Sequence, residues 1–208
     1  HSSGQTRGVN VWPENPMGQS SEDLVERVQW TFPIVFDNHD SDILYTGTQK
    51  VWRTRTEGES WEVISDDLTK ADPATLVTGK GGDGNIQYAT ITSIAQSPLN
   101  ADVIWAGTDD GNLQVTRDGG ESWTLLNDNV PDNPEYWVSR VEASHHDPGT
   151  AYVTYTGYRR DDFRPFVYRT TDFGESWTDL SAGLPMGPLN VIREHPDNRD
   201  ILFLGSEF

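Results

Sequence analysis

The feature that most limits what this chain can fold into is an internal repeat. The stretches VWRTRTEGESWEVI, LQVTRDGGESWTLL and VYRTTDFGESWTDL begin at Val51, Leu113 and Val167 and align with one another. A second shared unit precedes each of them, and one more copy of that unit begins at Val191. Repetition of this kind indicates that equivalent supersecondary units stack to bury a common core. The chain is therefore predicted to consist of copies of one unit.

Each unit alternates short β-branched and aromatic runs with clusters of Asn, Asp, Gly and Pro. This pattern predicts four antiparallel strands per unit, with no helical periodicity. Units of about 40 to 60 residues with four strands have the size of a β-propeller blade. We predict an all-β fold of β-propeller blades, each a four-stranded antiparallel sheet, with about three and a half blades in the chain. The predicted boundaries are a tag remnant at 1–4, a single propeller domain over 5–208, blades over about 30–68, 91–128 and 137–182, a half blade over 189–208, and an N-terminal strand over 8–13.

Two of the repeated stretches contain a recognisable turn. TRDGGESW from Thr116 and TTDFGESW from Thr170 resemble the Asp box, or BNR repeat, S/T-x-D-x-G-x-S/T-W, whereas the copy at Thr54 has Thr56 in place of the Asp. The resemblance implies relatives among sialidases, xyloglucanase-type glycoside hydrolases, sortilin-like sorting receptors and photosystem assembly factors. Over residues 8–208 the chain is most similar to bacterial sortilin-like repeat proteins of unknown activity. Because the same turn occurs in enzymes and in receptors, the resemblance implies a fold rather than an activity.

The residue types in the box have a structural explanation. Its Asp can accept hydrogen bonds from backbone N–H groups of its own turn, and its Gly permits a backbone conformation that a Cβ would penalise. Its Trp packs back against the blade and buries a large apolar area. We therefore predict structural rather than catalytic or metal-binding roles for these positions. The predicted structural set is Thr116, Asp118, Gly120, Ser122, Trp123, Thr170, Asp172, Gly174, Ser176, Trp177, Gly58, Ser60 and Trp61.

Histidines raise the question of a metal site. His39, the pair His145–His146 and His195 all fall in the turn between the first two strands of their units. Equivalent positions in successive blades lie a blade width apart, and neither a Cys nor an HExxH motif accompanies them. We predict polar turn residues here, no metal and no cofactor, since phosphate-binding and dinucleotide motifs are also missing from the sequence.

Charge limits the partners. The chain has 33 acidic and 15 basic residues, and its net charge is −18. Such a chain repels phosphate backbones, so nucleic acid is excluded as a partner, and no apolar run is long enough for membrane insertion. A glycan or a protein remains as the predicted ligand.

Propeller topology indicates where that ligand binds. The loops between second and third strands share one face with the connections between blades, opposite the Asp boxes and histidine turns. Two long segments fall on this face, Ser65 to Thr90 and Tyr155 to Phe166. The second is either a solvated charged loop or a binding lip. The predicted ligand-binding residues are Tyr158, Arg159, Arg160, Phe163 and Arg164. The candidate catalytic carboxylates are Asp161, Asp162, Asp109 and Asp110.

Two functions follow. The leading hypothesis is a non-catalytic module that binds protein or glycan through the loop-rich face, and the resemblance implies a bacterial extracytoplasmic location, periplasmic or secreted. The alternative is a glycoside hydrolase of the xyloglucanase or sialidase-like type, which needs paired carboxylates. Three and a half blades leave open sheet edges. Three explanations remain: the chain is part of a longer protein, two copies close a seven-bladed ring as a homodimer, or the sheets stack open.

Overall fold

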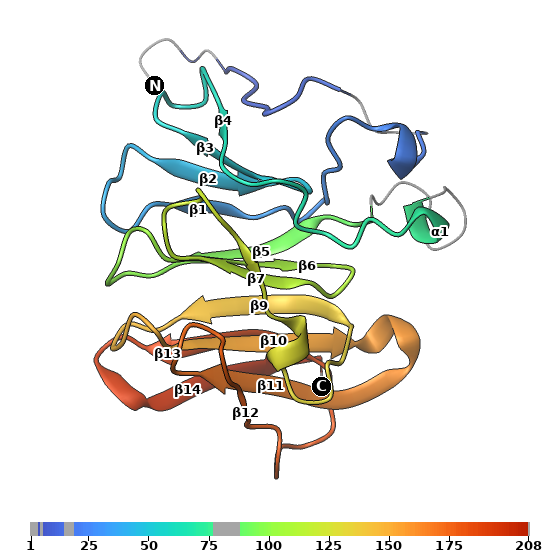
Figure 1. The fold of residues 1–208 in the computed structure, drawn as a ribbon, viewed down its shortest axis with the longest axis vertical. Coiled ribbons are helices and arrows are strands. Elements are labelled where there is room, and N and C mark those ends of the chain that lie inside the picture. The colour runs from blue at the N-terminus through green and yellow to red at the C-terminus, as the bar shows by residue number, and fades with distance from the viewer. Residues whose placement is uncertain (1–3, 5, 15–18, 77–87, 208) are drawn as a thin grey trace.

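The blades predicted from the repeat are present. The computed structural model describes residues 4, 6–14, 19–76 and 88–207, and in these residues the first three sheets follow one another along the long axis (Figure 1). Three sheets have four strands and the last has two, with neighbours along the chain paired antiparallel in each. The predicted all-β fold of four-stranded propeller blades is confirmed. Strand bounds are β1 Ile34–Phe36, β2 Leu44–Gly47, β3 Val51–Thr54 and β4 Glu62–Val63 in blade 1; β5 Ile91–Gln96, β6 Ile104–Thr108, β7 Leu113–Thr116 and β8 Thr124–Leu125 in blade 2; β9 Trp137–Ala143, β10 Ala151–Gly157, β11 Asp162–Thr170 and β12 Thr178–Asp179 in blade 3; and β13 Leu189–His195 and β14 Asn198–Ser206 in the half blade.

The helical turns in the described part of the chain are short, and all but the first lie between strands. They are η1 Ser21–Asp23, α1 Pro73–Leu76, η2 Asn127–Asn129 and η3 Tyr158–Arg160. None of the helices in the described residues is long and apolar enough to cross a membrane.

The core lies between the sheets. One apolar cluster joins blades 1 and 2, a second joins blades 2 and 3, and a third joins blade 3 to the half blade. Trp105, fully buried, meets the Asp-box Trp177 edge to face, with 6.1 Å between ring centroids. Trp123 donates its Nε1–H to the carbonyl oxygen of Ile64 at 2.8 Å, which ties blade 2 to blade 1. Each blade thus buries its faces against its neighbours.

The Asp-box side chains are held within their own turns. Asp118 accepts hydrogen bonds from the N–H and hydroxyl of Ser122 at 2.9 and 2.5 Å and from the Thr116 hydroxyl at 2.7 Å. These bonds, that of the Ser122 hydroxyl foremost, lower the pKa of Asp118 to about 2. In blade 1 the hydroxyl of Thr56 takes over the bond to the Ser60 N–H, at 2.9 Å. The turn therefore forms without its aspartate but with fewer acceptors.

Residues 8–13 form no strand in the structure, so the prediction of an N-terminal strand there is wrong. A strand needs a partner that completes its hydrogen-bond ladder, and none of the described strands pairs with this segment. Its side chains instead contact the blade 1 turn. A Cβ added to Gly58 would meet Val9, just as a Cβ on Gly120 would meet Ile64 and one on Gly174 would meet Leu126. Val9 therefore occupies the place that an adjoining blade's outer residue occupies at the other joints.

Candidate binding site on the loop-bearing face

The two ends of the blades differ in what they carry. The turns between first and second strands, like the Asp-box hairpins, lie at one end of the sheets, and α1 with the loop between β10 and β11 lies at the other (Figure 1). We call this second end the loop-bearing face. The predicted long segment Ser65 to Thr90 belongs to it, but residues 77–87 lie outside the described residues. The predicted loop Tyr155 to Phe166 forms the end of β10, η3 and the start of β11.

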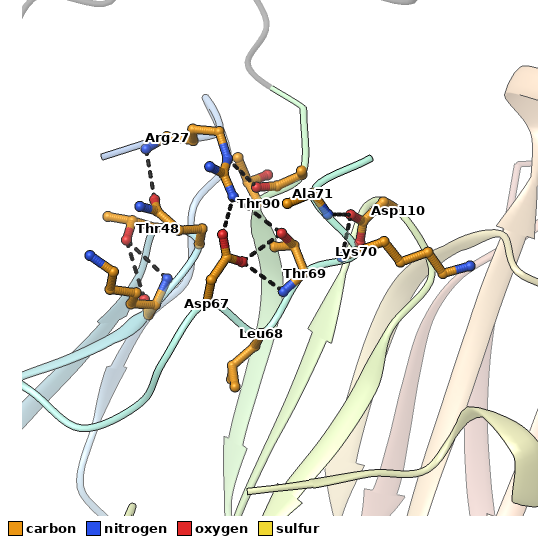
Figure 2. A network of polar contacts seen from close by, with 12 residues as sticks. Arg27, Thr48, Asp67, Leu68, Thr69, Lys70, Ala71, Thr90 and Asp110 are labelled. Carbon is orange, nitrogen blue, oxygen red and sulfur yellow. Dashed lines mark hydrogen bonds and ion pairs between the residues drawn. The ribbon is translucent and has the colours of Figure 1, made fainter. Parts of the chain in front are cut away.

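A polar network fixes the connection between blades 1 and 2 on this face (Figure 2). The guanidinium of Arg27 donates to Asp67 at 2.6 Å and to the carbonyl oxygen of Ala89 at 2.9 Å. Asp67 in turn accepts the N–H and hydroxyl of Thr69 at 2.9 and 2.6 Å. Hydrogen bonds between charged groups are stronger than hydrogen bonds between neutral groups. The network holds both ends of the long connection in place beside the β6–β7 loop.

Asp109 and Asp110 in the β6–β7 loop are buried carboxylates. Asp109 accepts the N–H and hydroxyl of Thr90, each at 2.8 Å, and Asp110 accepts the N–H of Lys70 at 2.8 Å and the hydroxyl of Thr108 at 2.6 Å. Burial raises the pKa of Asp109 to about 7, and the neighbouring Asp110 adds to the shift. Burial also raises the pKa of Asp110. Both side chains anchor the connection, and Asp109 changes charge near neutral pH.

A cavity of about 240 Å³ opens above Asp109. Its wall combines two arginines with three aromatic side chains and two threonines. The lining residues are Thr75, Tyr88, Asp109, Tyr136, Trp137, Thr156, Arg159 and Arg160. A second hollow of about 290 Å³ adjoins it and shares Thr75, Tyr88 and Arg160. The second hollow also contains Asp110, Lys70 and Glu135.

The two arginines lie over aromatic rings. The guanidinium carbon of Arg159 is 4.9 Å from the Trp137 ring centroid, and that of Arg160 is 5.6 Å from the Tyr136 centroid. Both arginines belong to η3, which ends at Asp161 in a left-handed conformation with φ of 56°. Cation–π contact of this kind is attractive, because the ring face is electron-rich. The turn therefore places two cations, each over an aromatic ring, in the cavity wall.

The remaining predicted loop residues lie elsewhere. Arg164 forms an ion pair with Asp162 at 2.6 Å and lowers the pKa of that carboxyl to about 2, with the Tyr136 hydroxyl also donating to Asp162 at 3.0 Å. Tyr158 and Phe163 contact each other edge to face, with centroids 5.9 Å apart. Of these side chains Tyr136 lines the cavity, whereas the predicted residues Arg164, Asp162, Tyr158 and Phe163 line neither hollow. The charged-loop alternative thus describes the Arg164 end of the segment. Arg159 and Arg160 line the cavity, and their role in a binding lip stays a prediction.

Sequence reasoning missed the aromatic half of the cavity. Tyr136 and Trp137 stand where the connection from blade 2 enters β9, and Tyr88 stands just before β5. Tyr88 and Tyr136 precede the first strand of a blade and Trp137 begins one, at the end shared with the β6–β7 and β10–β11 loops. An aromatic residue at the start of the first strand of a blade is the sequence signal that could have predicted this cavity wall.

The largest apolar cavity, about 420 Å³, shares none of the residues that line these two hollows. It separates the N-terminal segment around Trp12 from the outer face of blade 1, including Ile34 and Trp61. At the other joints the corresponding face of a blade is covered by its neighbour. We interpret this cavity as part of a blade-packing surface rather than as the ligand site.

The histidine turns connect adjacent blades. The Nε2 atom of His39 lies 3.0 Å from the carbonyl oxygen of Ser97, and that of His146 lies 3.0 Å from the carbonyl oxygen of His195. Within the described residues no group of three or more His, Cys, Asp or Glu side chains is placed to hold a metal ion. Two of these rings thus make contacts that cross a blade joint.

The repeated sheets and their turns define the class of protein: the chain is an Asp-box β-propeller. Its sequence is 33% identical over 101 residues to vacuolar protein sorting/targeting protein 10 of Mycosarcoma maydis, a match that covers 47% of this chain and 6% of that protein. It is 27% identical over 158 residues to an oligoxyloglucan-reducing end-specific xyloglucanase of Emericella nidulans, covering 73% of this chain and 18% of that protein. The chain thus spans less than a fifth of either relative. No family model matches the sequence.

Solved structures show the same fold. The GH74 enzyme of Niastella koreensis superposes with a TM-score of 0.59 at 20% identity, over 82% of this chain and 24% of that one. YCF48 from Cyanidioschyzon merolae superposes with a TM-score of 0.51 at 18% identity, over 82% of this chain and 48% of that one. At these identities the similarity shows the propeller fold alone.

Proposed function

We propose that the chain is a non-catalytic module that binds a protein or glycan ligand through its loop-bearing face. The observation that carries the proposal is the cavity lined by Arg159, Arg160 and Asp109, in which each guanidinium lies over an aromatic ring. Proteins bind small ligands, or single residues of larger ligands, in concave sites with aromatic walls and a few polar groups. The sortilin-like and xyloglucanase relatives support an extracytoplasmic location, and we propose a bacterial periplasmic or secreted protein.

Calorimetric titration against a panel of polysaccharides and peptides tests this function. Trp137→Leu should weaken binding of any ligand found by about tenfold, because the ring forms the cavity wall and orients Arg159. Phe173→Leu is the matched control, since Phe173 lies under Arg117 and belongs to the Asp box of blade 3, at the opposite end of the sheets. Equal loss of binding in both variants would contradict a site on the loop-bearing face.

A glycoside hydrolase is the second candidate, and Asp109 is the observation that favours it. A general acid needs a protonated carboxyl near working pH, and the pKa of Asp109 is about 7. However, glycoside hydrolysis needs two carboxylates facing one sugar. Among the described residues Asp109 is the one carboxylate that lines the 240 Å³ cavity, while Asp110 lines the adjoining hollow, and neither Asp161 nor Asp162 lines one. The geometry supports binding better than turnover.

An assay of product release separates the two functions. We expect no reducing-end release from xyloglucan or other polysaccharides by the unmodified chain. Turnover that disappears in Asp109→Asn, or in Asp161→Ala/Asp162→Ala, would instead establish the hydrolase.

A further inference from the structure

We propose that a second copy of this chain seats its half blade on the free face of blade 1. Blade 1 and the half blade are the first and last sheets of the series, and each exposes apolar side chains that no described neighbour covers. The blade 1 face carries Ile34 and Phe36, and the half-blade face carries Ile201 and Phe203. The proposal does not depend on the ligand site, because none of these four residues lines the 240 Å³ cavity.

The blade 1 face repeats a surface that is buried in blade 2. Ile34 of β1 pairs with Thr46, and Ile94 of β5 pairs with Ala106, where Thr46 and Ala106 each precede the glycine of the repeat. The two isoleucines therefore hold the same position. Ile94 packs against blade 1 and is 4% exposed, whereas Ile34 is 61% exposed. Blade 1 thus has the apolar side chain of a blade joint without the preceding blade.

The half-blade face repeats the opposite surface of a blade. Phe203 stands two residues before the glycine of the repeat, as Trp105 does in blade 2. Trp105 is fully buried against blade 3, where it meets the ring of Trp177. Phe203 stacks on His195 of its own sheet, yet 57% of its surface is exposed. The half blade thus carries the aromatic anchor of a joint but has no following blade among the described residues.

The N-terminal segment shows which part of blade 1 is still open. Val9 fills the space beside Gly58, as Ile64 fills the space beside Gly120 at the joint between blades 1 and 2. The segment therefore stands in for the outer strand of a preceding blade. The apolar cavity of about 420 Å³ extends from it to β1 and β2. The half blade consists of the two inner strands, β13 and β14, so it supplies the inner part of the joint that this segment leaves open.

The two faces are different surfaces, so the contact is head to tail. Both are exposed in the same chain, and therefore they do not cover each other. A head-to-tail contact leaves one free face at each end, and copies add until a ring closes or an open chain of copies grows. Exposed apolar patches of this kind mark interaction sites, because burying them is favourable. The net charge of −18 opposes association, so salt should strengthen it.

Sedimentation equilibrium from about 1 to about 200 µM, in about 0.15 M salt, tests the proposal. We expect the mean mass of the unmodified chain to rise with concentration to two copies or more. Ile34→Asp and Phe203→Asp should each weaken association at least about tenfold, because a charge replaces an apolar anchor. Leu125→Asp is the matched control, since Leu125 is 54% exposed but lies on β8 of blade 2, outside both faces. Circular dichroism and thermal melting check that each variant is folded.

An equimolar mixture of Ile34→Asp and Phe203→Asp distinguishes head-to-tail contact from any other. Phe203→Asp keeps the blade 1 face, and Ile34→Asp keeps the half-blade face. At a concentration where neither variant associates alone, the mixture should form pairs and stop there, because the remaining face of each partner is blocked. A single-chain mass of the unmodified chain at every concentration would overturn the proposal. Association that survives unchanged in either variant, or a mixture that stays monomeric, would overturn it as well.

Discussion

Asp118 and Asp109 belong to the same blade, at the two ends of its central strands, and their environments shift their pKa values in opposite directions. Asp118 is exposed, yet hydrogen bonds within its own turn lower its pKa to about 2. Asp109 is buried, and the loss of solvation raises its pKa to about 7 even though Thr90 donates two hydrogen bonds to it. The comparison teaches that the Asp-box end uses its carboxylate to hold a turn. The loop-bearing end buries a carboxylate in the wall of a cavity that two arginines also line.

The largest expected effect is on the pH dependence of stability. The pKa of Asp109 rises from 3.8 unfolded to about 7 folded, so its contribution is greatest below 3.8 and is lost as pH rises through 7. The shift corresponds to on the order of 4 kcal/mol of unfolding free energy. We expect urea unfolding to show the folded chain losing stability between pH 4 and about 8, and Asp109→Asn to flatten that slope. An unchanged pH dependence of stability in Asp109→Asn would show that a group other than Asp109 causes it.

The Asp-box end should be sensitive to backbone change. Gly120 has φ of 103°, and an added Cβ would lie 2.7 Å from the carbonyl oxygen of Ile64 in blade 1. Gly120→Ala should therefore lower the unfolding free energy by about 2 kcal/mol through backbone strain and a forced shift of the joint. The matched control is Gly183→Ala, which also has positive φ but nothing within 4 Å of the added Cβ. An equal loss of unfolding free energy in both variants would show that contact between blades 1 and 2 does not cause the effect.

The capping role of the Asp-box carboxylate predicts a smaller loss. Asp118→Ala removes the acceptor of three hydrogen bonds in one turn and should lower the melting temperature by about 3 °C. Ligand affinity should be unchanged, because the turn lies at the end opposite the cavity. A normal melting temperature together with lost ligand binding in Asp118→Ala would show that the Asp-box end, and not the loop-bearing end, binds the ligand.

The smallest effect is a gain. In blade 1 Thr56 stands where blades 2 and 3 have an aspartate, and its hydroxyl supplies one acceptor for the Ser60 N–H. Thr56→Asp should add a charged acceptor and raise the unfolding free energy by about 0.5 kcal/mol. Chemical denaturation would detect the change, and a loss of stability would show that this turn differs from the other two.

The sequence predicted the fold because the repeat is regular: strand periodicity, turn residues and the Asp box all indicate the same unit. It also placed Asp109 with Arg159 and Arg160, since propeller topology brings those loops to one end. It did not predict the aromatic wall, because Tyr136 and Trp137 have the same pattern as core residues entering a strand. It was wrong about residues 8–13, because a strand-like sequence becomes a strand only when a neighbour offers an unpaired edge.

One experiment tests the central claim most directly: ligand titration and thermal melting of Asp118→Ala and Arg159→Gln/Arg160→Gln side by side. The account predicts that Asp118→Ala melts lower and binds ligand as the unmodified chain does, whereas the arginine variant melts normally and loses ligand binding. Loss of binding in Asp118→Ala together with intact binding in the arginine variant would contradict the assignment of ligand binding to the loop-bearing face.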